Sequence, residues 1–572
     1  MKTDKIITLV SLGTIVGFIT GFVYSLNHVL ANRYFQYKMY KLITLSFQDH
    51  LNKWVMVSII SFIVLSLFSL LTSSIWILVL KIFSKIEIRS ASKSKYLIKV
   101  KWENLSKLIK VNALLLLIFL LALNLYISID GEVNISKGPN VVFILIDCLR
   151  PDHLGCYGYK RDTSPTIDRL AQEGIIFTNA YCNAPWTKPS MTSIFTSLYP
   201  NVHKVINYSN VLPDGVLTIA EILKNHGYKT YFFNGGNAFI KKEFNFDQGF
   251  DEYTYLSPKS KNAMDLTCEY LTQASKIRRK KYFAYLHYMD AHTPYNKNEY
   301  NNLFIKNGNK FFEPGSPKSR SNVIREVTYS GKLSSGGKKN IVSLYDGQIR
   351  FIDENIKKIV LFLKSENRLK DTLIIITSDH GEEFWEHNNF EHGHTLYNEL
   401  LRVPLIITGN KIEHSEIASP VSLIDLSSTI LELVNIKADR FTHQGMNLLR
   451  RLNSRGYKLQ SSIFAVGTFY GDEKYCLIKD NKKIIFNTGK KEKKAPLIGY
   501  KNKGSFEFYD LEEDLFEREN LAKKECKMVY QLENELVQFK NKESVFQEEY
   551  DETVIVIDEE LKEKLSSLGY LH

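Results

Sequence analysis

The segment Asn140-Val-Val-Phe-Ile-Leu-Ile-Asp-Cys-Leu-Arg-Pro-Asp-His-Leu-Gly-Cys-Tyr-Gly158 begins with an unbroken apolar run and then turns polar. The run from 140 to 146 is too short for a helix and is typical of a strand buried in a parallel sheet. Asp147 follows it directly. Because ligands of open α/β sheets bind outside the carboxyl ends of the strands, Asp147 is a candidate site residue. A structural alternative, an Asp that caps the next helix, stays open.

Two other segments repeat this arrangement. The apolar run 282–287 leads into Asp290-Ala-His-Thr-Pro-Tyr295, and the run 372–377 ends in Ser378-Asp-His-Gly-Glu382. A His-rich stretch, Glu391-His-Gly-His-Thr-Leu-Tyr397, comes soon after. Three strands thus place Asp or His at their carboxyl ends, which predicts an α/β domain with a polar site at one edge of its sheet.

The segment Ala184-Pro-Trp-Thr-Lys-Pro-Ser-Met-Thr-Ser193 is typical of a helix start, with Pro189 at the first helical position. Thr187 stands just ahead of it, where unpaired N–H groups and the helix dipole favour an anion. This is a suitable place for a nucleophile that attacks a phosphate or sulfate ester. A plain helix cap is the structural alternative.

A divalent metal would activate such a hydroxyl, which is a poor nucleophile until its pKa is lowered. The predicted ligands are Asp147, Thr187, Asp379 and His380. Mixed oxygen and nitrogen ligation favours Zn or Mn, while Mg and Ca stay open, as does a second metal.

The motifs extend along most of the chain. They are Ile146-Asp-Cys-Leu-Arg-Pro-Asp-His-Leu-Gly-Cys-Tyr-Gly-Tyr159, Ser164-Pro-Thr-Ile-Asp-Arg-Leu170, Gly174-Ile-Ile-Phe-Thr-Asn-Ala180, Ser378-Asp-His-Gly-Glu-Glu383, Tyr509-Asp-Leu, Glu519-Asn-Leu-Ala522 and Leu568-Gly-Tyr. On these motifs, the chain resembles the sulfatase-like branch of the alkaline phosphatase superfamily. The resemblance implies an α/β fold with an alkaline-phosphatase-like mixed sheet sandwiched by helices, and a small C-terminal α+β subdomain. It also implies a substrate-oxygen contact for His292 and a leaving-group or second-metal role for His394.

Three departures from the family pattern change the expected chemistry. True sulfatases carry Cys or Ser in place of Thr187 and oxidise it to a formylglycine hydrate, which Thr cannot give. The family's Arg is Met191 here, and its second Asp is Cys148. A Thr nucleophile instead resembles the phosphoethanolamine and phosphoglycerol transferases of the superfamily, and some of its phosphodiester and phosphonate hydrolases.

Other polar residues near the motifs receive weaker assignments. His287 lies inside a strand and is expected to be structural. Asp290 is expected to orient His292, and His387 to lie on a surface loop. Functional and structural interpretations stay equally open for three residues: Lys188, Asn237 and His392.

The N-terminal part, residues 1–130, is predicted to be a membrane domain. Its apolar stretches 6–26, 55–80 and 111–129 are each long enough to span a bilayer. The loop between the second and third spans carries nine Lys and Arg, against four in the first loop. The positive-inside rule therefore places the second loop in the cytosol and everything after the third span outside it.

This topology also explains the charge. Of the chain's net charge of +12, residues 1–130 contribute +10, from 15 Lys and Arg against 5 Asp and Glu. The rest is close to neutral. The basic balance therefore indicates membrane topology and excludes nucleic acid as the expected partner.

The remaining residues are expected to form a catalytic domain at 138–449 and a C-terminal subdomain at 457–572, joined by the basic stretch 450–456. The six cysteines show no metal-type spacing and no disulfide framework.

The sequence therefore predicts a multi-pass cell-membrane metalloenzyme with an extracytoplasmic catalytic domain. It is expected to cleave or transfer a phosphoester, such as a lipid headgroup or an envelope polymer unit, through a covalent Thr187 intermediate. Membrane lipids are expected partners. One alternative is a sulfatase, a sulfuric ester hydrolase acting on an envelope or glycan substrate. Another is a membrane binding or regulatory protein with a degenerate site.

Overall fold

The computed structural model describes residues 138–256, 262–277, 280–296, 298–305, 330, 333–409, 412–436, 444–449, 462–491 and 505–541. The predicted membrane domain with its spans at 6–26, 55–80 and 111–129 lies outside these residues, as does the predicted border at 450–456. Within the described ranges, no helix is both long and apolar enough to cross a bilayer. All described residues belong to the unit 134–572.

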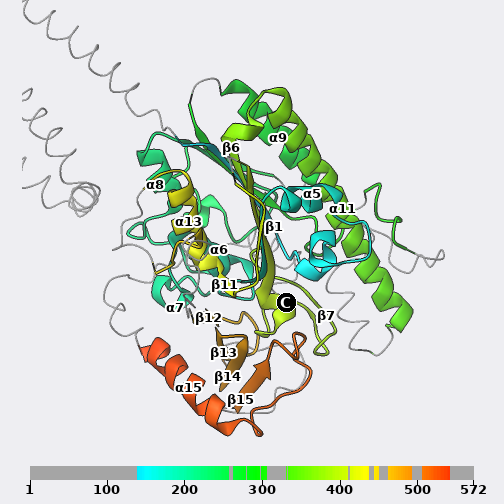
Figure 1. Ribbon diagram of the computed structural model, residues 1–572, viewed down its shortest axis with the longest axis vertical. Helices are drawn as coiled ribbons and strands as arrows, with labels where there is room; N and C mark the ends of the chain where they lie inside the picture. The colour runs from blue at the N-terminus through cyan, green and yellow to red at the C-terminus, as the bar shows by residue number, and fades with distance from the viewer. Residues whose placement is uncertain are drawn as a thin grey trace, which may run out of the picture. The chain divides into compact units, whose positions relative to one another are not determined.

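A mixed sheet of nine strands forms the centre of the described fold (Figure 1). In spatial order its strands are β10 (Ser415–Ile417), β2 (Ile175–Tyr181), β9 (Arg402–Gly409), β6 (Thr372–Thr377), β1 (Asn140–Ile146), β5 (Tyr282–Tyr288), β3 (Lys229–Asn234) and β4 (Glu252–Tyr255), and β11 (Val421–Ser422) pairs with β2. β1 is parallel to both of its neighbours, β5 and β6. β9 is antiparallel to β6 and β2. The structure confirms the predicted mixed α/β sheet.

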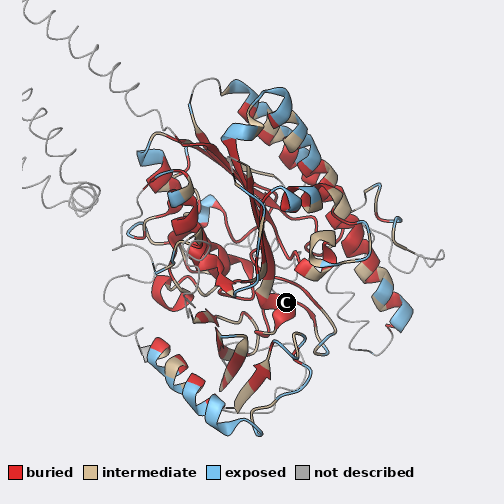
Figure 2. Cartoon of the chain, in the orientation of Figure 1, coloured by how far each residue is buried: buried red, intermediate tan, exposed pale blue. Residues whose placement is uncertain are grey.

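Helices cover both faces of this sheet, and the sheet is buried between them (Figure 2). One hydrophobic layer contains Val141, Phe143 and Leu145 of β1 and residues of α6 (Thr187–Thr196), α8 (Ile219–Asn225) and α13 (Leu426–Leu433). The other contains Val142, Ile144 and Ile146 and residues of α5 (Pro165–Gln172), α9 (Ala263–Lys276) and α11 (Ser335–Ser365). Alternate residues of β1 thus face opposite layers, which explains its uninterrupted apolar sequence.

A smaller antiparallel sheet follows in the C-terminal part. Its order is β12 (Ile463–Val466), β13 (Asp472–Lys479), β14 (Lys482–Lys491) and β15 (Ser505–Asp510). The amphipathic helix α15 (Cys526–Asn541) packs on it through Leu532, Leu536 and Phe539. The face of the small sheet toward α15 has a core of its own, while other residues of the same strands belong to the core of the large sheet.

Short elements complete the described ranges. They are helices α7 (Pro200–His203) and α12 (Asn398–Leu401), the strands β7 (Glu383–Phe384) and β8 (Phe390–Glu391), and 3-10 turns at Pro151–His153, Gly155–Tyr157, Lys242–Phe244, Leu369–Asp371 and Leu423–Asp425.

A buried ion pair connects the small sheet to the segment that contains α12. Lys483 Nζ lies 2.7 Å from Glu517 Oε1, and both side chains are fully buried. Lys483 also donates to Asn398 Oδ1 at 3.0 Å, and the other Glu517 oxygen accepts from the backbone N–H of Asn398. The two parts of the fold are therefore joined by a desolvated polar network as well as by packing.

Candidate active site

Four polar side chains from three separate segments meet at one edge of the large sheet. Asp147 directly follows β1, and Asp379 and His380 follow β6, the strand beside it. Thr187 is the first residue of α6, so this helix begins two residues earlier than Pro189 suggests. All four are fully buried. The carboxyl ends of β1 and β6 thus meet the start of α6, as the strand-end argument predicts.

The Thr187 hydroxyl is central to this group, which we call the Thr187 cluster. Its Oγ1 lies 3.3 Å from His380 Nε2 and 3.5 Å from Asp147 Oδ2. His380 Nε2 is 3.6 Å from Asp147 Oδ1 and 3.5 Å from Asp379 Oδ2. The structure brings the predicted atoms together, while their roles as ligands and nucleophile stay predictions.

The residues present fit a divalent cation. Ligands held at about 2.0–2.1 Å around a tetrahedral zinc ion lie roughly 3.3 Å apart, close to the separations in the Thr187 cluster. Asp379 Oδ2 accepts no hydrogen bond of ordinary geometry from the described residues. The ring of His380 faces Gly381 O with Nδ1 at 2.9 Å, and a proton on that nitrogen leaves the Nε2 lone pair for a metal.

The two carboxylates have pKa values shifted in opposite directions. Burial raises the pKa of Asp379, and the adjacent Asp147 carboxylate raises it further. Burial also disfavours the charge on Asp147, but a hydrogen bond from His287 and the nearby imidazoles hold its pKa well below the usual range. A cation would favour the ionised form of both.

His287 and Asn237 also belong to this site, although sequence reasoning excluded the first and left the second open. His287 Nε2 lies 3.0 Å from Asp147 Oδ2, and its Nδ1 lies 2.6 Å from Tyr285 Oη. Asn237 Nδ2 donates to Asp147 Oδ2 at 2.9 Å and to Thr187 Oγ1 at 3.4 Å. Both side chains orient the Asp147 carboxylate, so the structure places His287 beside the site from which sequence reasoning left it out.

Met191, the residue in place of the family's Arg, is part of the core. It is fully buried, and its Sδ accepts a hydrogen bond from Tyr285 Oη at 3.3 Å. An apolar thioether thus occupies the position where the family has a cation.

A second polar group adjoins the Thr187 cluster. Cys148, His292 and His392 are buried, and one ligand-type atom of each lies within 4.8 Å of the others. Cys148 Sγ is 3.6 Å from His392 Nδ1, which is also 3.2 Å from Glu382 Oε1. His392 is therefore a buried interior residue.

His394 lies in the same His-rich segment but points to a different partner. Its Nε2 is 2.8 Å from Glu383 Oε2. Burial disfavours the charge on Glu383, but this imidazole lowers the pKa of the carboxyl below its usual value. The potential ligand groups found among the described residues include His292 but not His394, and the predicted role of His394 stays a prediction.

Lys188 is neither a solvated lysine nor an exposed phosphate ligand. The residue is fully buried, and its Nζ donates to the carbonyls of Tyr208 and Asn210 at 2.6 and 2.9 Å. The same ammonium lies 3.2 Å from the centroid of the Phe244 ring. Its charge is therefore held inside the fold by carbonyls and an aromatic face.

Two further residues have structural contacts. Asp290 Oδ1 accepts from the backbone N–H of Ala263 and so caps the start of α9. His387 Nδ1 lies 2.6 Å from Glu399 Oε1 and is largely shielded, not on an open surface loop.

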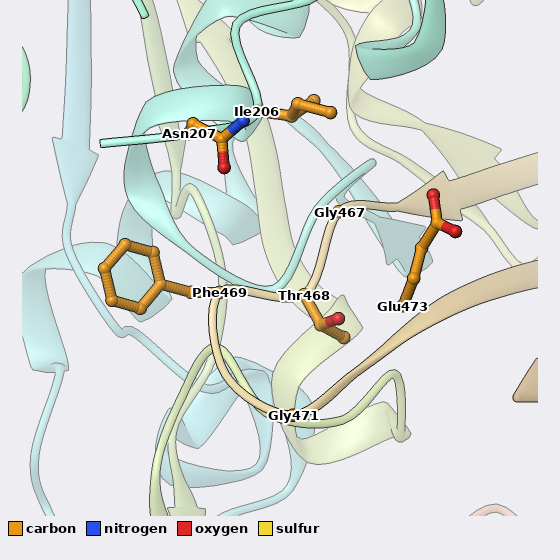
Figure 3. Close-up of a pocket in the computed structure, with 7 residues that line it drawn as sticks. All are labelled: Ile206, Asn207, Gly467, Thr468, Phe469, Gly471 and Glu473. Atoms are coloured by element: carbon orange, nitrogen blue, oxygen red, sulfur yellow. The ribbon is translucent and has the colours of Figure 1, made fainter. Parts of the chain in front are cut away.

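The loop between β12 and β13, part of which lines the small pocket drawn in Figure 3, contacts the segments beside the nucleophile. The indole N–H of Trp186 donates to Gly467 O at 2.7 Å, and the N–H of Phe469 donates to Gly393 O at 2.7 Å. A small pocket lies between this loop and Asn207. The segments on both sides of the site, 186–187 and 393–394, are thus fixed by the same loop.

A model of the sulfatase family matches residues 139–436, which is more than half of the chain. The chain belongs to the sulfatase family. Among curated proteins, it is similar to the "Uncharacterized sulfatase YidJ" of Escherichia coli, at 25% identity over 399 residues, covering 61% of this chain and 79% of that one. The resemblance inferred from the motifs is therefore confirmed, and so is its expectation of a hydrolase-type enzyme.

Solved structures share the fold. A protein in complex with its substrate D-glucosamine-2-N,6-O-disulfate aligns with a TM-score of 0.57 at 18% identity, over 73% of this chain and 99% of the other. A phosphonate monoester hydrolase of Agrobacterium radiobacter aligns with a TM-score of 0.56 at 17% identity, over 71% and 96%. One of these neighbours acts on a sulfated sugar and the other is named for a phosphonate ester, so the fold alone does not define the ester.

Proposed function

We propose that this sulfatase-family protein hydrolyses a sulfate ester and that Thr187 Oγ1 is its nucleophile. The observation that carries the proposal is the position of this hydroxyl, at the start of α6 and within 3.5 Å of both Asp147 and His380. Family membership and the names of the relatives support the sulfate ester over the phosphoester that the sequence analysis put first.

The Thr187 cluster would hold a divalent ion through Asp147, Thr187, Asp379 and His380. The chemistry that this ion supplies when bound is a lower pKa for the Thr187 hydroxyl and neutralisation of charge on the ester oxygens. Ca or Mg, the usual ions of the family, and Zn or Mn all suit oxygen and nitrogen ligands.

The chain's own residues orient the reacting group. Asn237 donates to both Asp147 and Thr187, so the hydroxyl is held by its neighbour as well as by the helix start. Attack by Oγ1, whose own proton passes to water, forms a bond to sulfur or phosphorus and breaks the bond to the ester oxygen, which leaves as an alcohol after gaining a proton. We assign that proton to His394, whose ring is held by Glu383. Water then cleaves the covalent intermediate and restores the hydroxyl.

Two observations favour a second candidate, cleavage or transfer of a phosphoester. Thr187 cannot become a formylglycine hydrate, so a sulfated Thr187 has to be released by direct attack of water on sulfur. Met191 also leaves the place of the family's Arg without a cation. Both features suit a phosphorylated threonine, which water or an alcohol acceptor can attack.

A paired turnover assay tests both candidates. The full chain would be offered an aryl sulfate and an aryl phosphodiester with added Ca, Mg, Mn or Zn, beside two variants. Thr187→Val keeps the shape of the side chain without the hydroxyl, and Thr187→Ser keeps the hydroxyl. We expect turnover to fall at least 10³-fold in Thr187→Val, an order of magnitude typical of a lost nucleophile, and to survive in part in Thr187→Ser. Equal turnover in Thr187→Val would contradict the proposed nucleophile, and the ester that is cleaved decides between the two candidates.

We further propose that the N-terminal stretches anchor the enzyme in the cell membrane with the catalytic domain outside the cytosol, near membrane lipids. The three apolar segments and the basic second loop support this topology. The exposed thiol of Cys526 offers a test. A membrane-impermeant maleimide should label it in intact cells and should not label a Cys526→Ser variant at that position. Labelling only after lysis would contradict the topology.

A further inference from the structure

We propose that Lys188 positions the nucleophile, because its buried ammonium joins the start of α6 to the loop segment that carries Asn237. The inference rests on the proposed function, since it concerns the same Thr187 hydroxyl. Lys188 is the residue after Thr187, and both are fully buried. Lys188 acts through Asn237 and not by contact with the ester, so it is a positioning residue and not a catalytic one.

Two loop segments contact the ammonium of Lys188. Its Nζ donates to the carbonyls of Tyr208 and Asn210, at 2.6 and 2.9 Å, in the loop after α7. It also lies 3.2 Å from the centroid of the Phe244 ring and 5.8 Å from that of Phe239, in the segment between β3 and β4. One cation on the nucleophile's helix thus contacts both segments.

The segment between β3 and β4 also carries the amide that reaches the nucleophile. Asn237 Nδ2 donates to Thr187 Oγ1 at 3.4 Å and to Asp147 Oδ2 at 2.9 Å. Asn237 Oδ1 accepts a hydrogen bond from the backbone N–H of Phe239 at 2.8 Å. Phe239 therefore orients the Asn237 amide through its backbone and faces the Lys188 ammonium through its ring. Lys188, Phe239 and Asn237 form a path of contacts that ends at the Thr187 hydroxyl.

Hydrogen bonds between the two loop segments make them move together. The backbone N–H of Leu212 donates to Phe244 O at 3.1 Å, and Asn245 Nδ2 donates to Leu212 O at 2.8 Å. The loop whose carbonyls hold Lys188 is therefore bound to the segment whose rings face it. The first turn of α6 is also fixed beside the Thr187 cluster, where Ser190 Oγ donates to Asp379 O at 2.6 Å.

The cost of the buried charge indicates a specific role for Lys188. Burying an ammonium is unfavourable unless hydrogen bonds and ring faces replace its water, and an apolar side chain of similar length would fill the space without this cost. A cation requires carbonyl oxygens and ring faces in defined directions, whereas an apolar side chain does not. Lys188 thus selects one arrangement of the two segments, the arrangement in which Asn237 reaches Thr187.

A double-mutant cycle on turnover is the first test. The full-length protein would be assayed at saturating metal with the aryl ester that it cleaves, beside Lys188→Met, Asn237→Leu and the double variant. Asn237→Leu keeps the approximate volume of the amide without its donor. We expect each single variant to lower kcat about 10–100-fold, and the double variant to remain within about 3-fold of Asn237→Leu. Unchanged kcat in Lys188→Met, or effects that multiply in the double variant, would overturn the proposal.

Lys483→Met is the matched control. Lys483 is also a fully buried lysine, but it lies in β14 of the small sheet and pairs with Glu517. Its replacement also removes a buried cation, so we expect lower stability but the wild-type kcat at a temperature at which the variant is folded. A fall in kcat equal to that of Lys188→Met would mean that turnover follows stability alone, and would contradict a positioning role.

Hydrogen exchange followed by mass spectrometry needs neither an ester nor a metal. We expect faster amide exchange over residues 236–246 in Lys188→Met than in the wild type, and wild-type exchange over this range in Lys483→Met. A wild type that cleaves no ester would refute the proposed function, and this exchange would then decide the contact path by itself. Unchanged exchange in Lys188→Met would refute the path. Should Lys188→Met not fold, Phe244→Leu removes the ring that faces the ammonium, and we expect it to give the same non-additivity with Asn237→Leu.

Discussion

Replacing His287 by Leu should weaken metal binding without abolishing catalysis. The imidazole and Asp147 Oδ2 are both fully buried and 3.0 Å apart, so the substitution removes a hydrogen bond to a charged group in a water-free place. Such a bond contributes about 1.5–3 kcal/mol, which corresponds to a factor of roughly 10–150 in an equilibrium constant. Asn237 still donates to the same oxygen, at 2.9 Å, so the carboxylate keeps one partner. We therefore expect the lower part of the range, a metal Kd raised about 10–30-fold.

The assay is a titration of metal-free protein in competition with a chromophoric chelator, followed by turnover at saturating metal. Turnover should recover at high metal concentration, because His287 orients a predicted ligand and touches no predicted reacting atom. Tyr285→Phe is the matched control. It removes the neutral hydrogen bond to His287 Nδ1, together with the weaker one to Met191 Sδ, and should raise Kd by about 2–10-fold. An unchanged Kd in folded His287→Leu, or turnover lost at saturating metal, would refute the reasoning.

Three further outcomes follow from buried charges. Lys483→Met leaves Glu517 buried without its cation and should lower the free energy of unfolding by about 3–5 kcal/mol in a denaturant titration. The double variant Lys483→Met/Glu517→Gln should recover part of this loss. Equal stability of the single variant and the wild type would contradict the prediction. Burial disfavours the charge on His387, but Glu399 raises its pKa to about 9. Since this folded-state pKa exceeds the unfolded value, the stabilisation by His387 is complete below about pH 6.5 and is lost as the pH rises through 9. The melting temperature of the wild type should therefore fall more over this window than that of His387→Gln. Melting temperatures that fall in parallel in the two proteins would exclude the effect. Met191→Arg restores the family's residue but buries an unpaired charge, so it should lower the free energy of unfolding by about 3–5 kcal/mol in the same titration. We expect no gain in aryl sulfate turnover from this variant. A stable and more active variant would show that the site accommodates the Arg.

The sequence was sufficient to predict the Thr187 cluster because the end of a buried strand can be recognised in the sequence. An apolar run that stops at Asp147 or Asp379 identifies the edge of a parallel sheet, whatever the rest of the chain does. It was not sufficient for His287, because a polar residue inside a strand gives no sign of what it faces. The alternation of side chains along a strand contains the missing information, because residues two apart face the same side of the sheet. His287 is two residues after Tyr285, and in the sheet it lies beside Leu145, so it faces the layer that contains α6 and Thr187.

Contacts made by loops were harder to foresee. Asn237 lies in a glycine-containing turn, where its side chain reaches Asp147 only because β3 ends two strands away from β1. Lys188 points into the fold because the carbonyls of Tyr208 and Asn210, in the loop after α7, accept hydrogen bonds from its ammonium group. Such contacts depend on loop paths, which local sequence patterns do not define.

The loop between β12 and β13 has a consequence for the time course of synthesis. A chain leaves the ribosome from its N-terminal end, and its domains tend to fold in that order. Trp186, next to the nucleophile, finds the acceptor for its indole N–H only at Gly467, 281 residues later. The ribosome therefore has to translate the chain beyond Gly467 before the surroundings of Trp186 are complete, and a chain that terminates earlier would carry Thr187 without the loop that binds its neighbour.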